Sequence, residues 1–393
     1  MVRAMLAAAA AIALGASAPA PARYLVNEDG VYGFVDAAGG RVLTLPAAVT
    51  EARPFAGGLA AVARREASGV RWGFIDEHGA MAILPRFDAA GDFSDDRAAV
   101  VLHGRLGYID RRGALVIAPQ FAADADRIAD AAFSNGLAAV TDVRSKRGYI
   151  DRAGRAVIAF QYAVAFPFAG DRARVARPEP DGEARFGYID RAGRWVVPPR
   201  FQQARDFAGG VASVLDGSRA AFIDRDGRTT VTLEAHDLAP CAGSTEDGLP
   251  GSFSEGLAAV RVGCLWGYID STGATVIPPA YFSAGRFSGG VAAVNTGDAA
   301  LAKWGYVDRS GRMAIAARFS TAAAFDGPLA LVQIGGSDQE LLNRALLRGL
   351  EDDAANQTIK TQAKADFHPG TPMRKPELAY VDATGRVVWH HAR

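Results

Sequence analysis

The sequence has few of the residues from which most catalytic and metal sites are built. Its 393 residues include two cysteines and six histidines. The histidines are scattered without a His-Glu-x-x-His spacing, and neither cysteine belongs to a Cys-x-x-Cys pair. A Gly-x-Ser-x-Gly segment and a phosphate-binding Walker loop are also missing. We therefore predict no catalytic residue, no metal ion and no cofactor.

The chain also lacks an excess of charge of either sign. Lys and Arg together number 43, and Asp and Glu together number 43. Proteins that bind nucleic acid concentrate basic residues, which neutralise the phosphates. The balance therefore predicts no nucleic acid partner.

Long apolar runs are absent except at the N-terminus. There, residues 4–18 are small or apolar, and Arg3 is the only charged side chain before them. The run is shorter than the ~20 apolar residues that a spanning helix needs. It ends in small-x-small sites such as residues 16–18, which are typical of signal peptide cleavage. We predict a signal peptide over residues 1–22, export to the periplasm or the extracellular space, and no integral membrane segment in the mature chain; the alternative is an uncleaved N-terminal helix.

The two cysteines are Cys241 and Cys264. In an oxidising compartment an even number of cysteines favours a disulfide, which would here close a short loop. The bridge would hold an insertion over about residues 232–252, rich in Pro, Gly and Ser, against the segment that follows. The alternative is a pair of buried free thiols.

What the sequence does contain is one unit, best seen at residues 266–281. This stretch reads Trp-Gly-Tyr-Ile-Asp-Ser-Thr-Gly-Ala-Thr-Val-Ile-Pro-Pro-Ala-Tyr. Alternating side chains predict a strand up to Asp270, which opens an Asp-x-x-Gly turn, and a second strand that ends at the prolines. Phe287 and a Ser-Gly-Gly turn then lead into Val-Ala-Ala-Val, a third strand. Each unit is thus predicted to have three short strands.

Copies of this unit fill most of the chain. The aspartates that open the turns are 34 to 46 residues apart, except for a last interval of 74. Such periods indicate a repeat array, in which each unit buries its apolar face against the next. The turn aspartates are Asp36, Asp76, Asp110, Asp151, Asp190, Asp224, Asp270, Asp308 and Asp382.

The chain resembles the bacterial WG-repeat family. That family is named for the Trp-Gly that precedes Tyr-Ile-Asp-x-x-Gly, followed by Val-Ile-Pro-Pro-x-Tyr and Phe-Ser-x-Gly-Leu-Ala-x-Val. The resemblance covers about residues 31–335 and 378–389. Some copies depart from the pattern: one has Ala221 in place of the Gly, and the last has Ala379 there. The resemblance implies an interaction or binding module and brings no catalytic residues with it.

These observations predict an all-β array of about nine three-stranded antiparallel WG-type units. The array is either an open β-solenoid or superhelix, or a closed propeller-like ring, because both bury repeated aromatic faces. The predicted segments are a signal peptide (1–22), repeats 1–8 (23–335), a helical and polar insertion (336–376), and a final atypical repeat with a C-terminal cap (377–393).

The insertion contains one predicted helix. Ser-Asp-Gln-Glu at residues 337–340 matches a capping box, and leucines follow at helical spacing, so we expect the helix near 337–352. The helix is either a lid or partner-binding element, or it packs on the array and shields one end.

Three side-chain types have competing interpretations. The turn aspartates are best explained by the turn itself. Trp72, Trp266 and Trp304 are predicted to be core residues, the alternative being surfaces that stack on sugars or peptides. Arginines beside the turns would form a rim that binds carboxylates or phosphates if the units stack in register, or else a solvated edge neutralised by the adjacent Asp. This predicted binding rim consists of Arg111, Arg152, Arg155, Arg191, Arg194, Arg225, Arg228, Arg309 and Arg312.

The function predicted from these features is that of a non-enzymatic, exported scaffold that binds a protein or a cell-envelope polymer. The first alternative is an extracytoplasmic hydrolase with its site in a channel of the array or under the insertion at 336–376. The second is a purely structural envelope protein that assembles through strand edges.

Overall fold

The computed structural model describes residues 22–67, 69–125, 127–178, 182–217, 219–233, 249–297, 303–334 and 377–391. The predicted signal peptide, the predicted helix near 337–352 and Cys241 lie outside these residues. None of the helices in the described ranges is long and apolar enough to cross a membrane.

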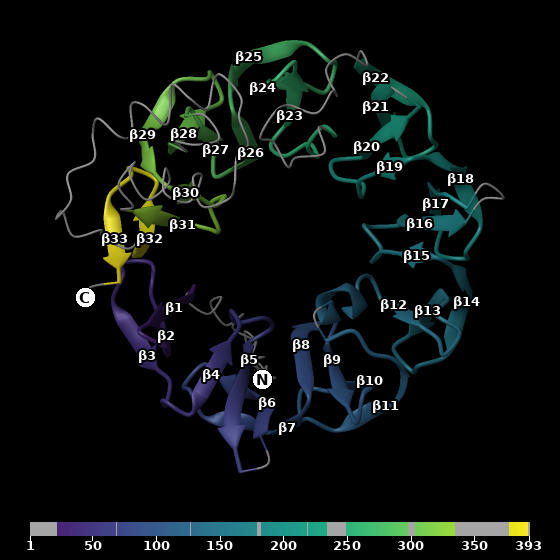
Figure 1. The fold of residues 1–393 in the computed structure, drawn as a ribbon, viewed down its shortest axis with the longest axis vertical. Helices are drawn as coiled ribbons and strands as arrows, with labels where there is room; N and C mark the ends of the chain where they lie inside the picture. The colour runs from purple at the N-terminus through teal and green to yellow at the C-terminus, as the bar shows by residue number, and fades with distance from the viewer. Residues whose placement is uncertain are drawn as a thin grey trace, which may run out of the picture.

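Nine small antiparallel sheets form a closed ring, a nine-bladed propeller (Figure 1). We number the blades 1 to 9 in chain order. Within each blade the strands follow the chain, so that the first lies nearest the centre of the ring and the last lies at its outer edge. The closed alternative is therefore confirmed, and the open solenoid is not formed.

Blades 1, 4 and 7 have three strands each, which correspond to the second, third and fourth strands of the other blades and are counted as such below. Their strands, with one short 3-10 helix before blade 4, are β1 (Tyr24–Glu28), β2 (Val31–Val35) and β3 (Arg41–Thr44); η1 (Ile128–Ala131), β12 (Leu137–Thr141), β13 (Arg147–Asp151) and β14 (Ala156–Tyr162); and β23 (Leu257–Val262), β24 (Leu265–Asp270) and β25 (Thr275–Tyr281).

Blades 2, 3 and 5 have four strands each. They are β4 (Val49–Ala52), β5 (Leu59–Glu66), β6 (Gly69–Asp76) and β7 (Met81–Phe87); β8 (Ala89–Ser94), β9 (Arg97–Leu102), β10 (Arg105–Ile109) and β11 (Leu115–Ala122); and β15 (Val164–Ala165), β16 (Ala173–Pro178), β17 (Ala184–Ile189) and β18 (Trp195–Phe201).

Blades 6, 8 and 9 also have four strands. They are β19 (Gln203–Ala204), β20 (Val211–Asp216), β21 (Arg219–Asp224) and β22 (Thr229–Leu233); β26 (Ser283–Ser288), β27 (Val291–Asn295), β28 (Trp304–Asp308) and β29 (Met313–Phe319); and β30 (Thr321–Ala322), β31 (Leu329–Ile334), β32 (Glu377–Asp382) and β33 (Val387–His390). The sequence predicted three strands per unit and missed the innermost one, because several of these strands are only two residues long and show no alternation.

The glycine of Trp-Gly is required where the third strand meets the fourth. At Gly267 an added Cβ would lie 2.5 Å from the Ile277 carbonyl oxygen and 2.7 Å from the Pro279 nitrogen. The β24–β25 register shifts around this position, leaving Gly267 without a paired residue in β25. In blade 6, where Ala221 replaces the glycine, the ladder is regular and Ala221 pairs with Thr232. In blade 1, Gly33 pairs with Thr44 without this bulge, so the glycine permits the bulge but does not impose it.

Every junction between neighbouring blades contains a pair of aromatic rings. One ring comes from the third strand of a blade, two residues after the position of the Trp in the repeat. The other ring comes from the start of the next blade. Their centroids are 4.6 to 5.2 Å apart. The pairs are Phe34–Phe55, Phe74–Phe93, Tyr108–Phe133, Tyr149–Phe168, Tyr188–Phe207, Phe222–Phe253, Tyr268–Phe287, Tyr306–Phe325 and Tyr380–Tyr24.

Where the third-strand aromatic is tyrosine, its hydroxyl also crosses the junction. The Tyr149 hydroxyl donates to the Phe166 carbonyl in the next blade at 2.8 Å, and the Tyr268 hydroxyl donates to the Gly285 carbonyl at 2.8 Å. At the closing junction the Tyr380 hydroxyl donates to the Leu25 carbonyl at 2.9 Å. The last blade thus meets the first through the same kind of contact that joins neighbours elsewhere.

The closing junction relies on side-chain packing. Blades 1 and 9 share no strand, since β1 pairs only with β2, and β33 only with β32. Instead Tyr24, Val26 and Val35 pack against Tyr380 and Trp389 in one buried cluster. In Figure 1 the two ends of the described chain accordingly lie beside each other.

The tryptophans expected in the core are there. Trp72 and Trp266 are buried, and Trp304 is partly buried against the core between blades 8 and 9. They pack inside the ring wall and do not form a stacking surface for a ligand.

Two glycines of blade 1 allow a direct test of the closed ring. Gly30 and Gly39 both have positive φ, at +86° and +83°, but only at Gly39 would a Cβ overlap the carbonyl of Val388 in blade 9. We expect Gly30→Ala to lower the free energy of unfolding by about 1 kcal/mol, the cost of the left-handed conformation. Gly39→Ala should cost about 1–3 kcal/mol more, because the junction is overpacked. Urea unfolding measures both, and equal losses would contradict closure at this contact.

Candidate functional site

All nine turn aspartates serve the turn. In each, Oδ1 accepts the backbone N–H groups two and four residues later; for Asp270 these are Thr272 at 2.9 Å and Ala274 at 3.1 Å. The other eight repeat this pair of bonds. The Thr272 hydroxyl, with the backbone N–H groups, lowers the pKa of Asp270. These carboxylates therefore have a structural role.

The turns lie on one face of the ring, which we call the turn face. In an antiparallel blade the connection between the first and second strands and the connection between the third and fourth strands lie at the same end. The Phe-x-x-Gly turns and the Asp-x-x-Gly turns therefore share the turn face. The connections between second and third strands lie on the opposite face.

In five of the nine turns the residue after the aspartate is an arginine, which reaches inward along the turn face. Arg111 donates to the Gly57 carbonyl in the Phe-x-x-Gly turn of the preceding blade, and Arg225 is 3.5 Å from Asp171 in the corresponding turn. These inward arginines are roughly half exposed, with 48% for Arg111 and 52% for Arg225. The others are Arg152, paired with Asp95; Arg191, over the Phe168 ring; and Arg309, bound to the Glu255 carbonyl.

The second arginine, four residues after the aspartate, stays at the outer edge. These outward arginines have side-chain exposures of 74–83% and form an ion pair with the aspartate of their own turn. Arg155, for example, places Nε 2.7 Å from Oδ2 of Asp151. The outward arginines are Arg155, Arg194, Arg228 and Arg312, with Arg386 equivalent in blade 9. The predicted rim is thus two rows with different surroundings.

The expected disulfide remains a prediction. Cys264 lies in the short connection between β23 and β24, on the face opposite the turn face. Its expected partner lies outside the described residues. β22 ends at Leu233 toward that same opposite face, which agrees with a local loop starting there.

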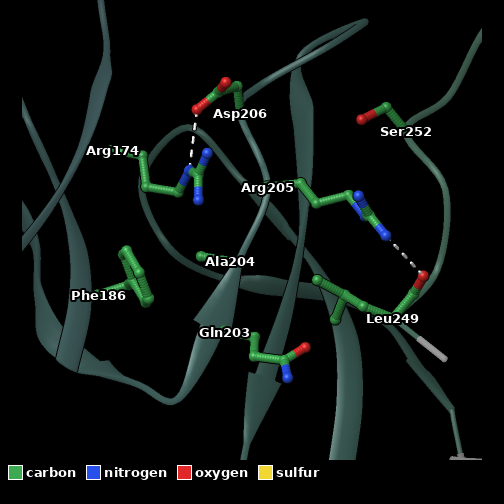
Figure 2. Close-up of a pocket in the computed structure, with 8 residues that line it drawn as sticks. All are labelled: Arg174, Phe186, Gln203, Ala204, Arg205, Asp206, Leu249 and Ser252. Atoms are coloured by element: carbon green, nitrogen blue, oxygen red, sulfur yellow. Dashed lines mark hydrogen bonds and ion pairs between the residues drawn. The ribbon is translucent and has the colours of Figure 1, made fainter. Parts of the chain in front are cut away.

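A cavity of about 430 Å³ lies between the inner parts of blades 5 and 6 (Figure 2). Arg174 and Phe186 line one side, and Leu249 and Ser252 line the other. The β19 strand and the residues after it supply the rest of the lining, Gln203, Ala204, Arg205 and Asp206.

Arg174 is held in place from three directions. Its Nε donates to Oδ1 of Asp206 at 2.9 Å, across the junction between the two blades. Its guanidinium carbon lies 3.5 Å from the centroid of the Phe166 ring and 5.5 Å from that of Phe186. Its side chain is only 14% exposed. Such stacking and pairing fix the plane of the guanidinium group.

The far wall is fixed by backbone carbonyls. Nε of Arg205 donates to the Pro250 carbonyl at 3.0 Å, and the buried Ser213 hydroxyl donates to that same carbonyl at 2.8 Å. Arg205 also donates to the Leu249 carbonyl at 3.3 Å. These bonds hold residues 249–252 against blade 6, so the cavity has two defined walls.

One polar atom of the lining is unsatisfied within the part of the chain that the structure describes. Oε1 of Gln203 is buried and has no hydrogen-bond partner there. A buried acceptor without a donor is costly, but this oxygen has almost no accessible surface and is therefore closed to a ligand in the cavity.

Sequence reasoning missed this cavity, although the repeat holds a signal for it. Arg174 lies opposite Tyr188 in the ladder, at a position where five other blades have alanine. Phe166, two residues before the junction Phe168, occupies a position that is Gly or Ala in five other units. The two departures contact each other, since Arg174 lies over the Phe166 ring, and aligning the units would have revealed them.

The lining favours binding over chemistry. It offers two guanidinium groups, one carboxylate, an amide and a hydroxyl, which suit recognition of a polar ligand. Nowhere in the described ranges do three His, Cys, Asp or Glu side chains converge as metal ligands.

A family model described as "WG containing repeat" matches six segments that together cover half of the chain. Each segment runs from the third strand of one blade to about the second strand of the next, so the sequence repeat is out of step with the blade. The segments are residues 72–105, 107–142, 148–176, 186–218, 266–298 and 304–337. No curated protein matches the chain.

Several solved structures are distantly similar. BamB from Moraxella catarrhalis is 12% identical with a TM-score of 0.41, and the match covers 75% of this chain and 91% of that one. The AfRom2 CNH domain is 9% identical (TM-score 0.32; 64% and 91% covered), and a putative TolB from Agrobacterium tumefaciens is 13% identical (TM-score 0.28; 55% and 81% covered). At these values the likenesses carry no argument about function.

The turn aspartates predict how stability depends on pH. The pKa of Asp270 is lower in the folded protein than its usual value of about 3.9, so its ionisation stabilises the fold above about pH 4. This contribution is lost as the pH falls through the folded-state pKa. We expect Asp270→Asn to be less stable than wild type at pH 7, with the difference shrinking toward pH 3.

Urea unfolding at pH 7, 5, 4 and 3 measures this difference. Thr272→Val, which keeps the carboxylate but removes its hydroxyl donor, should show a smaller gap with the same trend. A gap that does not change with pH would show that ionisation of Asp270 plays no part.

Proposed function

Because this chain belongs to the family of WG containing repeat proteins, we propose that it works as a non-enzymatic scaffold that binds a protein partner. The proposal includes export, which is supported by the signal-peptide pattern of residues 1–22. The partner would bind on the turn face of the ring.

The outward arginines carry this proposal. They recur around one face, and each side chain is 74–83% exposed while an aspartate of the same turn holds its guanidinium group. An arginine held in this way loses less entropy when it binds a carboxylate. A ring of such groups suits a partner that presents acidic side chains at several points.

The inward arginines contribute differently. They bridge neighbouring blades, as Arg111 does to Gly57 and Arg225 does to Asp171. Their donors are therefore partly used within the ring, and we assign them mainly to its assembly. An experiment on partner binding should leave them unchanged.

The test compares two quadruple variants of the mature protein in pull-downs from envelope extract. The first removes the outward arginines, through Arg155→Ser, Arg194→Ser, Arg228→Ser and Arg312→Ser. The second removes four exposed arginines at or near the opposite face, through Arg65→Ser, Arg105→Ser, Arg144→Ser and Arg219→Ser. Both lose the same charge, so a general effect of charge would affect them equally.

We expect wild type and the opposite-face variant to retain one specific protein, and the turn-face variant to bind it at least about tenfold more weakly. Binding should also weaken as salt is raised. Equal retention by both variants would contradict the turn face as the binding surface. Retention of an envelope polymer in place of a protein would support the surface but change the class of partner.

A further inference from the structure

We propose that the cavity between blades 5 and 6 is a binding site for a carboxylate group that is bonded close to an N–H donor, the chemistry shared by an amino acid and the C-terminus of a peptide. The lining includes none of the outward arginines, so this proposal stands or falls independently of the proposed function. It rests on the fixed arginine of the cavity, the Asp206 carboxylate beside it and the local charge.

Arg174 supplies the group that would bind the carboxylate. Its Nε is committed to Asp206, whereas Nη1 and Nη2 have no acceptor among the described residues and border the cavity. The Phe166 and Phe186 rings keep the guanidinium plane fixed, so its outer edge faces the cavity as a preformed fork. Two parallel N–H donors match the two oxygens of one carboxylate.

The local charge favours a single negative charge. Arg174 and Arg205 contribute two positive charges and Asp206 one negative charge, which leaves a net charge of +1 in the lining. Much of Arg205 is used by the Pro250 and Leu249 carbonyls. A dianionic phosphate would lie near the Asp206 carboxylate, 2.9 Å from the same guanidinium group, and would be repelled by it. A monoanionic carboxylate fits better.

The N–H donor follows from the acceptor beside the Arg174 guanidinium group. The Asp206 side chain is 44% exposed at the cavity, and its carboxylate accepts hydrogen bonds. A ligand that carries an amide N–H or an ammonium group near its carboxylate would pair with Arg174 and Asp206 together. Phe186, Ala204 and Leu249 supply apolar contact for the carbon atoms between them.

The departures from the repeat support a role beyond assembly. Blades 2, 3, 4, 7 and 8 have alanine where blade 5 has Arg174, and their junctions are held by the same aromatic pair as the junction between blades 5 and 6. The ring therefore closes at those junctions without such an arginine. Burying most of the Arg174 guanidinium group is costly unless its donors are used.

Ligand-observed NMR with the mature protein tests the proposal with four probes: an N-acetylated tripeptide with a free C-terminus, the same tripeptide as its C-terminal amide, free alanine, and inorganic phosphate. We expect a free-carboxylate probe to bind at least about tenfold more tightly than the C-terminal amide and than phosphate. Binding of the tripeptide alone would indicate a peptide terminus, and binding of alanine alone would indicate a free amino acid.

Variants connect the signal to the cavity. Arg174→Ala should weaken binding of the free-carboxylate probe at least about tenfold, and Arg174→Lys should be intermediate because it keeps the charge without the fork. The matched control is Arg200→Ala. Arg200 also lies over a Phe ring, that of Phe201, and pairs with an aspartate, Asp216, but it does not line the cavity. Thermal unfolding checks that all three variants fold.

Three outcomes would overturn the proposal. They are no binding of any carboxylate probe to wild type, equal binding of the carboxylate and the amide, and equal binding by wild type and a folded Arg174→Ala variant. Phosphate binding tighter than carboxylate binding would overturn the choice of ligand class.

Discussion

The ring depends on one contact, the aromatic pair between the third strand of each blade and the start of the next unit. The two rings of a pair belong to neighbouring blades, so each blade has an aromatic ring that only the next blade can cover. In an open array, the last blade would leave Tyr380 exposed to water and the first would leave Tyr24 unpaired. Closing the ring brings these two together at 5.2 Å and removes both costs. A closed ring therefore satisfies a requirement that an open superhelix does not.

Much of this could be predicted from the sequence, because it is local. The Asp-x-x-Gly turns, the strands beside them and the burial of Trp266 follow from patterns within a few residues. Closure could not be predicted, since it depends on the rotation between neighbouring blades, to which every side chain at a junction contributes. The innermost strands were also missed. Strands as short as β19 form only because the next strand is already in place, and their two residues show no period.

The candidate binding residues were predictable to different degrees. The sequence identified the arginines beside the turns but could not separate the inward from the outward row. That separation depends on contacts such as Arg309 with Glu255, 54 residues earlier in the chain. The cavity was missed for another reason. Arg174 is not part of the pattern that the units share. It is informative only because its counterparts in five other blades are alanine.

The repeat itself accounts for the neutral charge and indicates where specificity should be sought. Six of the nine turns place an aspartate beside an arginine, and several inward arginines meet the acidic residues of the preceding blade, so the charges that recur are largely balanced within the ring. Residues used for assembly in every unit cannot distinguish one ligand from another. Discrimination must come from positions that depart from the repeat. Arg174 is such a departure and lines the polar cavity between blades 5 and 6, and a second one, Phe166, packs against its guanidinium group. Selective recognition of a small group is therefore expected there, while the turn face can offer only a repeated charge pattern.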